Sequence, residues 1–161
     1  MREKEDTLKA ASYIARLIYA STETEHKNIA LFELLLRTLA LLKDGADPRS
    51  VEKIFEIKLT DVEGFFPKLD GCVKCKRPVK KEPEEATFNL VLGGLTCTSC
   101  SKAITGGTTA PFKLFKEIVK IKSSPFEELK NITFDKNEIE RLNLLLRPYI
   151  SDHIGKDIRN W

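Results

Sequence analysis

The sequence predicts a mainly α-helical protein, a helical bundle into which a small cysteine-bearing lobe is inserted. Apolar residues recur at helical spacing in the first and last parts of the chain, whereas the middle is rich in glycine, proline and turn residues. All four cysteines lie in that middle segment. A chain of 161 residues with 42% hydrophobic content can bury one principal core. We therefore expect a helical domain of residues 1–66 and 108–161, with an insertion at residues 67–107.

The first two elements are predicted helices. The first is amphipathic, and its expected inward face is Leu8, Ala11, Ile14, Ala15 and Ile18, with Lys9, Ser12, Arg16 and Tyr19 opposite. The second should start at Asn28, a good N-cap, and stop at Gly45, which favours the left-handed C-cap conformation. Leucines surround nearly the whole of this second helix. We therefore expect it to be the central helix, buried by neighbours on several sides.

Three more helices carry clear start signals. Asp47-Pro48 combines a cap with a proline in the first turn, and the helix it opens should end at Gly64. Its expected inward face is Val51, Ile54, Phe55, Lys58 and Leu59. Pro111 should open a helix to about Lys122, with one face formed by Phe112, Phe115, Ile118 and Val119. Ser124-Pro125 repeats the cap-and-proline pattern and predicts a short helix to about Lys130.

The last long helix opens with Asp135 and Glu138, which form an acidic variant of the capping box, and should end at Gly155. Its expected buried stripe is Ile139, Leu142, Leu145, Leu146, Tyr149, Ile150 and Ile154. Pro148 interrupts the pattern, and a proline inside a helix costs about 3 kcal/mol and one backbone hydrogen bond. We expect a kink there, or two abutting helices.

The cysteines form two Cys-x-x-Cys pairs, Cys72 with Cys75 and Cys97 with Cys100. Two intervening residues let both sulfurs point to one side of a tight turn, and two such turns supply the tetrahedral thiolate cage that Zn²⁺ prefers. The second pair follows a predicted strand, Phe88 to Leu92, and a Gly-Gly turn. The pattern indicates a four-cysteine, zinc-ribbon-like lobe with one structural Zn²⁺. Four thiolates leave no open coordination position, so loss of the metal should unfold residues 70–102.

Other interpretations of the cysteines stay open. Disulfides fit poorly because the first residues do not resemble a signal peptide. A redox motif normally opens a helix beside a βαβ unit, whereas Cys75 is followed by Lys76-Arg77-Pro78. Iron in place of zinc and a degenerate, empty site are the remaining alternatives.

The sequence does not predict an enzyme or a small-molecule substrate. Its two histidines, His26 and His153, lie in a predicted loop and near the end of the last helix, so a Cys-His pair would need a cysteine already committed to metal. The glycine pairs lack the spacing and the Lys-Ser/Thr of a phosphate-binding loop. The apolar stretch from Ile29 to Leu42 is broken by charges and too short to span a bilayer, so no membrane role is expected.

Basic residues surround the first cysteine pair: Lys74, Lys76, Arg77, Lys80 and Lys81. On a rigid turn they could neutralise a phosphate backbone without reading sequence. Alternatively, they keep the lobe soluble and offset the negative charge of a tetrathiolate zinc centre. The formal charge of +3 permits nucleic-acid binding but does not identify it.

These motifs together resemble a known family. The segment Leu31-Phe32-Glu33-Leu34-Leu35-Leu36-Arg37, then Gly64-Phe65-Phe66-Pro67-Lys68-Leu69-Asp70-x-Cys72-x-x-Cys75, is similar to the C-terminal helical and zinc-binding part of the bacterial recombination mediator RecO. Gly93-Gly94-Leu95-x-Cys97-x-x-Cys100 and Tyr149-x-x-x-His153-x-Gly155 follow in the family's order. The resemblance covers nearly the whole chain, and it carries the family's metal positions over onto the four cysteines.

The resemblance implies a non-enzymatic role in DNA repair and recombination, in the RecF/RecO/RecR-type pathway. Members of this family bind DNA, pair with RecR, and help RecA load on DNA coated with single-strand-binding protein. They begin with an OB-fold, a β-rich nucleic-acid platform, whereas this chain opens directly on a helix. DNA binding by this chain alone should therefore be weak, and a cytoplasmic, nucleoid-associated location is expected.

The resemblance thus favours a protein-binding and scaffold role for this chain. We expect it to bind RecR and the acidic C-terminal tail of single-strand-binding protein, the latter in an apolar groove with a cation at its rim. Arg37 and Arg141 are candidates for that cation by residue type. The alternative function is a stand-alone helical zinc-ribbon adaptor that binds another protein or a nucleic acid.

Overall fold

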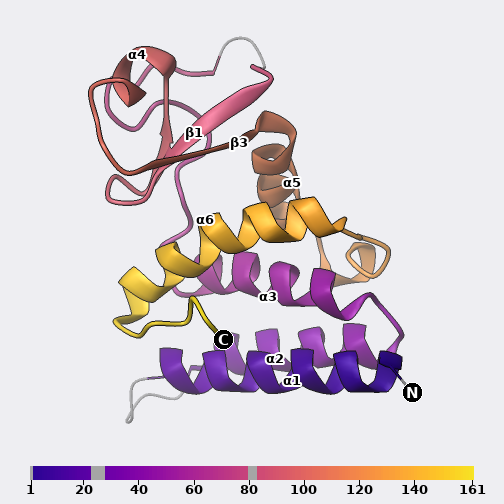
Figure 1. The fold of residues 1–161 in the computed structure, drawn as a ribbon. Coiled ribbons are helices and arrows are strands. Elements are labelled where there is room, and N and C mark those ends of the chain that lie inside the picture. The colour runs from indigo at the N-terminus through magenta and orange to yellow at the C-terminus, as the bar shows by residue number, and fades with distance from the viewer. Residues whose placement is uncertain (1, 23–27, 80–82) are drawn as a thin grey trace.

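The structure is a computed structural model and describes residues 2–22, 28–79 and 83–161. Figure 1 shows a layer of helices with a small antiparallel sheet above one end. This mainly α-helical fold with a sheet beside the cysteines confirms the predicted fold class. The elements in chain order are α1 (Arg2–Ser21), α2 (Ile29–Lys43), α3 (Pro48–Val62), β1 (Glu85–Asn89), β2 (Gly94–Thr96), α4 (Thr98–Ser101), β3 (Gly107–Pro111), α5 (Phe112–Ser123), the 3₁₀ turn η1 (Phe126–Glu128) and α6 (Lys136–Ile154).

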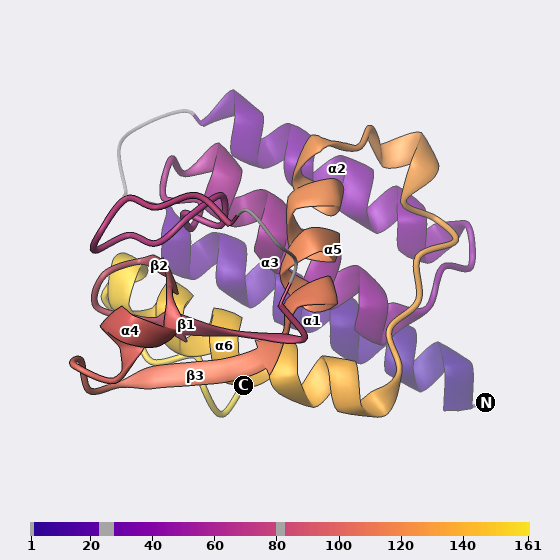
Figure 2. The ribbon, with the colours of Figure 1, turned by 90° about the horizontal axis from the view of Figure 1, so that it is seen from above.

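Helix α3 is the centre of the helical layer, so the prediction that the second helix is central was wrong. Helix α3 contacts α1, α2, α5 and α6, whereas α2 lies at the outer edge of the layer (Figure 2). One face of α2 is buried, but Ile29, Phe32 and Leu36 are 71%, 59% and 51% exposed. The prediction relied on the number of leucines in each helix, which is highest in α2. Helix α3 has fewer leucines but buries several polar residues, and the sequence does not show which residues are their partners.

Helix α1 is amphipathic, but its buried face is rotated from the predicted one. The buried residues are Ala10, Tyr13, Ile14, Leu17 and Ala20. Leu8 and Ala15, which were expected to face inward, are exposed. The inward face includes Tyr13 because its hydroxyl donates a 2.6 Å hydrogen bond to Glu56 of α3. A polar atom that has a buried hydrogen-bond partner can lie in a core. The buried face of α1 is therefore the one that contains Tyr13.

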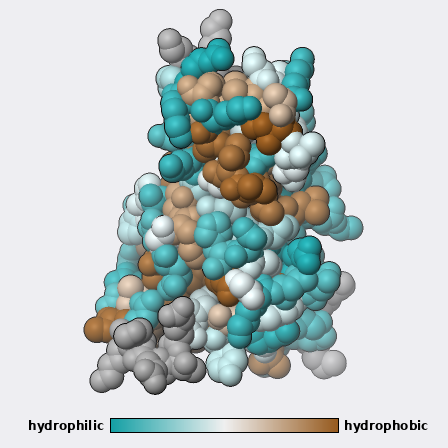
Figure 3. Space-filling view, turned by 90° about the vertical axis from the view of Figure 1, so that its left-hand side faces the viewer, coloured by the Kyte–Doolittle hydropathy of each residue, from teal (hydrophilic) through white to brown (hydrophobic). Residues whose placement is uncertain are grey.

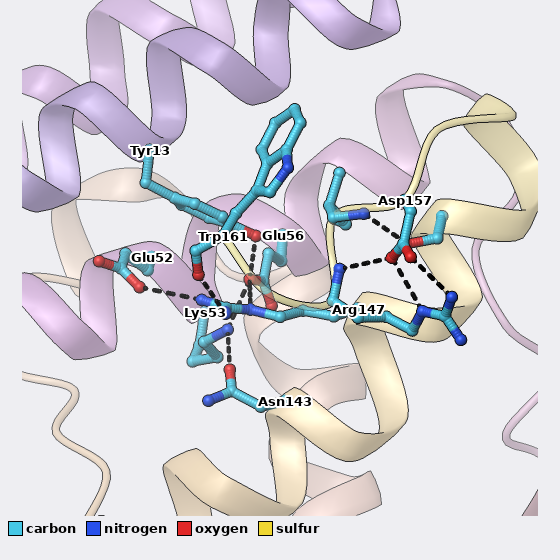
Figure 4. Close-up of polar contacts among 11 residues, drawn as sticks. Tyr13, Glu52, Lys53, Glu56, Asn143, Arg147, Asp157 and Trp161 are labelled. Carbon is cyan, nitrogen blue, oxygen red and sulfur yellow. Dashed lines mark hydrogen bonds and ion pairs between the residues drawn. The ribbon is translucent and has the colours of Figure 1, made fainter.

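A buried ionic network joins α1, α3 and α6 (Figure 4). Lys53 donates to Glu56 at 2.5 Å and to Asn143 at 2.6 Å, and the Lys53 and Glu56 side chains are 1% and 0% exposed. Arg147 lies 3.5 Å from the Glu56 carboxylate and donates to the Trp161 carbonyl at 2.7 Å. Burial, then the Glu56 carboxylate, raises the pKa of Tyr13, so this hydroxyl stays protonated and donates.

The ends of the long helices follow the sequence signals. The side chains of Asn28 and Asp47 cap α2 and α3, and Asp135 with Glu138 forms the predicted capping box. Gly155 ends α6 in the left-handed conformation, at φ +66°. Other details differ from the prediction. Val119 of α5 is exposed, and Ser124-Pro125 leads only to η1.

Helix α6 is a single element through Pro148, not two abutting helices. The proline removes the hydrogen bond that the Leu144 carbonyl would accept. Leu144 is 64% exposed, so water can reach this side of the helix. Leu145, Leu146, Tyr149 and Ile150 remain buried on the opposite side. Water can therefore hydrogen-bond the Leu144 carbonyl in place of the missing backbone donor.

The sheet has the strand order β2-β1-β3, and both pairs are antiparallel. Strand β1 covers residues 85–89, earlier than the predicted 88–92, because a turn begins at Leu90. In that turn the Asn89 side chain accepts from the Leu92 amide at 2.9 Å, and Gly93 adopts φ +67°. Strand β3 was not predicted, and it continues directly into α5. We call residues 67–111 the sheet region.

Tyr149 joins the sheet region to the helices. Its hydroxyl donates to the Phe65 carbonyl at 2.8 Å. Its ring meets Phe88 of β1 edge-on at 5.4 Å and also contacts Phe65 and His153. His153 stacks on Phe65 at 4.4 Å. These aromatic contacts hold β1, and the chain just before the sheet region, against the end of α6.

Candidate metal centre

The first cysteine pair lies in a tight turn closed by its own backbone. The Cys72 amide donates to the Arg77 carbonyl at 2.9 Å, and the Lys76 amide donates to the Cys72 carbonyl at 2.9 Å. Lys76 adopts φ +61°, the left-handed conformation that glycine tolerates best. This conformation reverses the chain just after Cys75. Both sulfurs therefore lie on one side of the turn, as the spacing predicted.

The second pair lies where β2 leads into α4. Cys97 follows β2 directly, and its carbonyl accepts the Ser101 amide at 2.8 Å in the single turn of α4. The two turns are joined by the Val73 amide, which donates to the Leu95 carbonyl at 2.8 Å. A side chain at Gly94 would meet Val73 at 2.5 Å, so the absence of a side chain there allows this close approach. The short sheet thus positions both pairs.

The four sulfurs form one cluster that can hold a single metal ion. All four lie within 4.8 Å of one another, and Cys75 and Cys97 are 3.8 Å apart. Zn–S bonds of about 2.3 Å in a tetrahedron would place sulfurs about 3.8 Å apart. The cysteines are free, so no disulfide cross-links the cluster. Donor type, number and spacing all fit a thiolate-bound ion.

Hydrogen bonds distribute the protons unequally over the sulfurs. Burial raises the pKa of the Cys72 thiol, but hydrogen bonds from the backbone of Cys75, Cys97 and Lys74 outweigh this effect and lower it to about 6. The hydrogen bond with Cys97 and then burial raise the pKa of the Cys100 thiol to about 12. A metal ion must displace such protons in order to bind, so protons and metal compete for the cluster.

The structure describes three of the five predicted basic residues: Lys74, Lys76 and Arg77 are exposed on the first turn. Lys76 folds back and donates to the Val73 carbonyl at 2.8 Å. The Cys75 sulfur, through hydrogen bonding and charge attraction, raises the pKa of the Arg77 guanidinium. Both therefore act on the cysteine turn itself, which agrees with the second of the two roles that the sequence left open. Lys80 and Lys81 lie outside the described residues, as does His26.

The two arginines proposed as groove residues, Arg37 and Arg141, do not line the depression at the start of α1. Arg37 lies 3.6 Å from Glu127 and is mostly exposed, and Arg141 is exposed on α6. A depression of about 910 Å³ lies instead between the start of α1, the turn before α3 and the segment after η1. Its lining includes Leu8, Ala11, Ala46, Lys4 and Lys130, with Asp6 and Asp47. The sequence did not predict this depression, because Leu8 was expected to lie inside the core and not at the surface.

The turn between β1 and β2 presents apolar side chains to solvent. Val91 and Leu92 are 85% and 42% exposed. Figure 3 shows hydrophobic side chains gathered on the upper part of the molecule, where the sheet region lies. Exposed apolar groups of this kind often mark a protein contact. Elsewhere, no helix in the described ranges is long and apolar enough to cross a membrane.

Comparison with known proteins identifies the same family that the sequence motifs resemble. Residues 2–161 match the family described as "Recombination protein O C terminal". The chain is 34% identical over 149 residues to the DNA repair protein RecO of Caldicellulosiruptor bescii, covering 92% of this chain and 59% of that protein. It is 28% identical over 162 residues to RecO of Syntrophus aciditrophicus, covering 99% and 62%. The chain thus spans about 60% of the length of these curated relatives.

Proposed function

This chain belongs to the RecO family of DNA repair proteins, and on that premise we propose that it is the protein-binding and scaffold part of a recombination mediator. The family match over residues 2–161, together with the four-cysteine cluster, is the observation that carries the proposal. The role is non-catalytic. The chain would help RecA load on DNA that is coated with single-strand-binding protein, while the cluster maintains structure.

The cluster is proposed to hold one structural Zn²⁺ through Cys72, Cys75, Cys97 and Cys100. Residues 67–107 then form a metal-supported insertion in a helical domain of residues 1–66 and 108–161. The direct contact between α3 and α5, which flank this segment in the chain, supports that division. Metal analysis of protein purified under reducing, chelator-free conditions should find one zinc per chain. A metal-free protein would refute the assignment.

The depression beside α1 is the proposed site for the acidic tail of single-strand-binding protein. Leu8, Ala11 and Ala46 offer an apolar wall, and Lys4 and Lys130 can pair with carboxylates. Of the two acidic residues in the lining, Asp47 already accepts from the Ser50 amide at 2.8 Å as the cap of α3. The sequence-based candidates Arg37 and Arg141 do not line this depression.

A titration with the tail peptide tests this site. Lys130→Glu should weaken binding about tenfold, because an attractive contact becomes repulsive. Lys102→Glu changes an exposed lysine of the sheet region in the same way and should leave the affinity unchanged. Equal affinities for the two variants and the original chain would move the tail away from this depression. No binding at all would remove this partner from the proposal.

The exposed turn of Val91 and Leu92 is the proposed contact for RecR. A pull-down with purified RecR should retain the chain, and Val91→Asp should abolish retention by placing a charge in an apolar interface. Val119→Asp is the matched control, since Val119 is an exposed valine on α5. If the chain retains neither RecR nor the tail peptide, the stand-alone adaptor becomes the better assignment.

DNA contact by this chain is proposed to be weak and to use the basic residues of the sheet region. Lys74 is the strongest candidate, because it is exposed while Lys76 and Arg77 contact the cysteine turn. Lys80 and Lys81 complete the proposed set. Changing Lys76 and Arg77 together to Glu, or Lys74 alone, should lower single-strand affinity and its salt slope. No change in either quantity would discard the DNA role.

A further inference from the structure

The outer face of α2 is apolar although the helix already buries its inner face. Leu31, Leu34 and Thr38 face inward and are buried. On the outer side, Ile29, Phe32 and Leu36 are each more than half exposed. A helix that is apolar on both faces is normally covered on both faces. The described residues of this chain cover only one of them.

The outer residues have the spacing of a helix-pairing seam. Ile29, Phe32 and Leu36 are separated by three and four residues, which is the alternation of a and d positions in a heptad. Such a stripe is narrower than the wide apolar face of a helix that packs on a core. It therefore fits one partner helix lying nearly parallel or antiparallel to α2.

The two edges of this apolar stripe differ in charge and burial, and this difference favours an antiparallel orientation of the partner helix. One edge carries the partly buried Leu35 and Leu39, while the other carries the exposed Glu33 and Arg37. When two copies pack face to face in antiparallel orientation, like edges meet across the two-fold axis. Glu33 then faces Arg37 of the second copy, in both directions. A parallel pair would instead place each charged edge against an apolar one.

Arg37 is available for such a pair. Its contact with Glu127, at 3.6 Å, joins two side chains that are largely exposed, and exposed pairs of this kind contribute little. Figures 1 and 2 place α2 at the outside of the helical layer, away from the sheet region. Contact through α2 would therefore leave the cysteine cluster and the turn of Val91 accessible.

We propose that the outer face of α2 pairs with the same face of a second copy of this chain, as an antiparallel two-fold dimer centred near Leu35. Phe32 of one copy packs against Leu36 of the other, and two Glu33–Arg37 pairs lie along one edge of this contact. A single helix pair gives a small interface, so the dimer forms reversibly and depends on protein concentration. This inference is independent of the proposed role in repair.

Sedimentation equilibrium of the 161-residue chain over a concentration series tests the dimer. The mass should rise from one chain to two as concentration increases. Leu36→Glu should keep the protein as one chain at every concentration. Leu144→Glu alters another leucine that is more than half exposed, on α6, and should leave the association unchanged. Far-UV circular dichroism checks that both variants are folded.

A charge exchange tests the orientation. Glu33→Arg places four cations along the shared edge and should raise the dimer dissociation constant about tenfold. Glu33→Arg combined with Arg37→Glu restores the pairs with opposite polarity and should recover the original dissociation constant. A single-chain mass at all concentrations, or Leu36→Glu and Leu144→Glu with equal effects, would overturn the proposal. Dimerisation without recovery by the exchange would overturn the antiparallel arrangement.

Discussion

Replacing Lys53 by Met should destabilise the protein strongly. Lys53 and Glu56 are fully buried partners, 2.5 Å apart. Of the charges in the network, Lys53 and Arg147 are positive, and Glu52 and Glu56 are negative. Lys53→Met removes the bonds to Glu56 and Asn143 and leaves one uncompensated buried negative charge. Breaking a buried pair in this way costs about 3–5 kcal/mol. We expect the lower end, about 3 kcal/mol, because Arg147 remains 3.5 Å from Glu56.

A double-mutant cycle separates this loss from the net contribution of the pair. Glu56→Gln alone leaves one uncompensated positive charge, whereas Lys53→Met with Glu56→Gln restores neutrality. The double variant should therefore lose at least about 2 kcal/mol less than the two single losses added together. Urea unfolding of zinc-loaded protein measures each free energy of unfolding. In thermal melts, a loss of about 3 kcal/mol corresponds to about 6–12 °C for a chain of this size.

The exposed pair Lys136–Glu140 provides the control. Its side chains are 81% and 61% exposed, so Lys136→Met should change the free energy of unfolding by about 0.5 kcal/mol or less. Two results would refute the reasoning about the network. One is a loss below about 1 kcal/mol for Lys53→Met, and the other is simple additivity in the cycle.

Three further outcomes are expected from the metal centre and its junction with the helices. Removal of zinc by a chelator should expose the sheet-region amides to hydrogen exchange while most helical circular dichroism persists, and equal protection with and without metal would contradict this. Arg77→Gln should speed zinc release to a colorimetric chelator several-fold, because the Arg77 guanidinium interacts favourably with the Cys75 thiolate and raises its own pKa by doing so, whereas Lys74→Gln should not. Equal rates would deny Arg77 this role. Tyr149→Phe should cost about 1 kcal/mol in urea unfolding by leaving the Phe65 carbonyl without its 2.8 Å hydrogen bond, and an unchanged midpoint would show that this bond contributes nothing.

Helix ends and cysteine spacing were predictable because both are local. Asn28, Asp47, Asp135 and Gly155 act on backbone groups within a few residues of themselves, so their neighbours in the sequence reveal their roles. The two-residue spacing within each cysteine pair likewise forces both sulfurs to one side of a turn. The sequence therefore predicted the candidate ligand set and the approximate limits of most helices.

Burial and side-chain roles depend on distant partners, and here the sequence was insufficient. Lys53 is fully buried because Glu56 and Asn143 both accept its hydrogen bonds, and Asn143 lies ninety residues away in the sequence. Strand β3 has a weak pattern of its own and exists because β1 pairs with it along five residues. For Arg77 the sequence left two roles open, contact with phosphate and compensation of the thiolate charge, and the structure places its guanidinium under the influence of the Cys75 sulfur.

The division of the helical layer also sets an order of events during synthesis. Helix α3 needs α5 and α6 to cover it, but the ribosome makes both after the four cysteines. Both cysteine turns therefore leave the ribosome while the inner face of α3 is still open to water. Binding of the proposed Zn²⁺ can then bring the two cysteine turns together before the last helices are made. A cell short of zinc would consequently accumulate nascent chains with an uncovered hydrophobic surface, which are natural targets for chaperones and proteases.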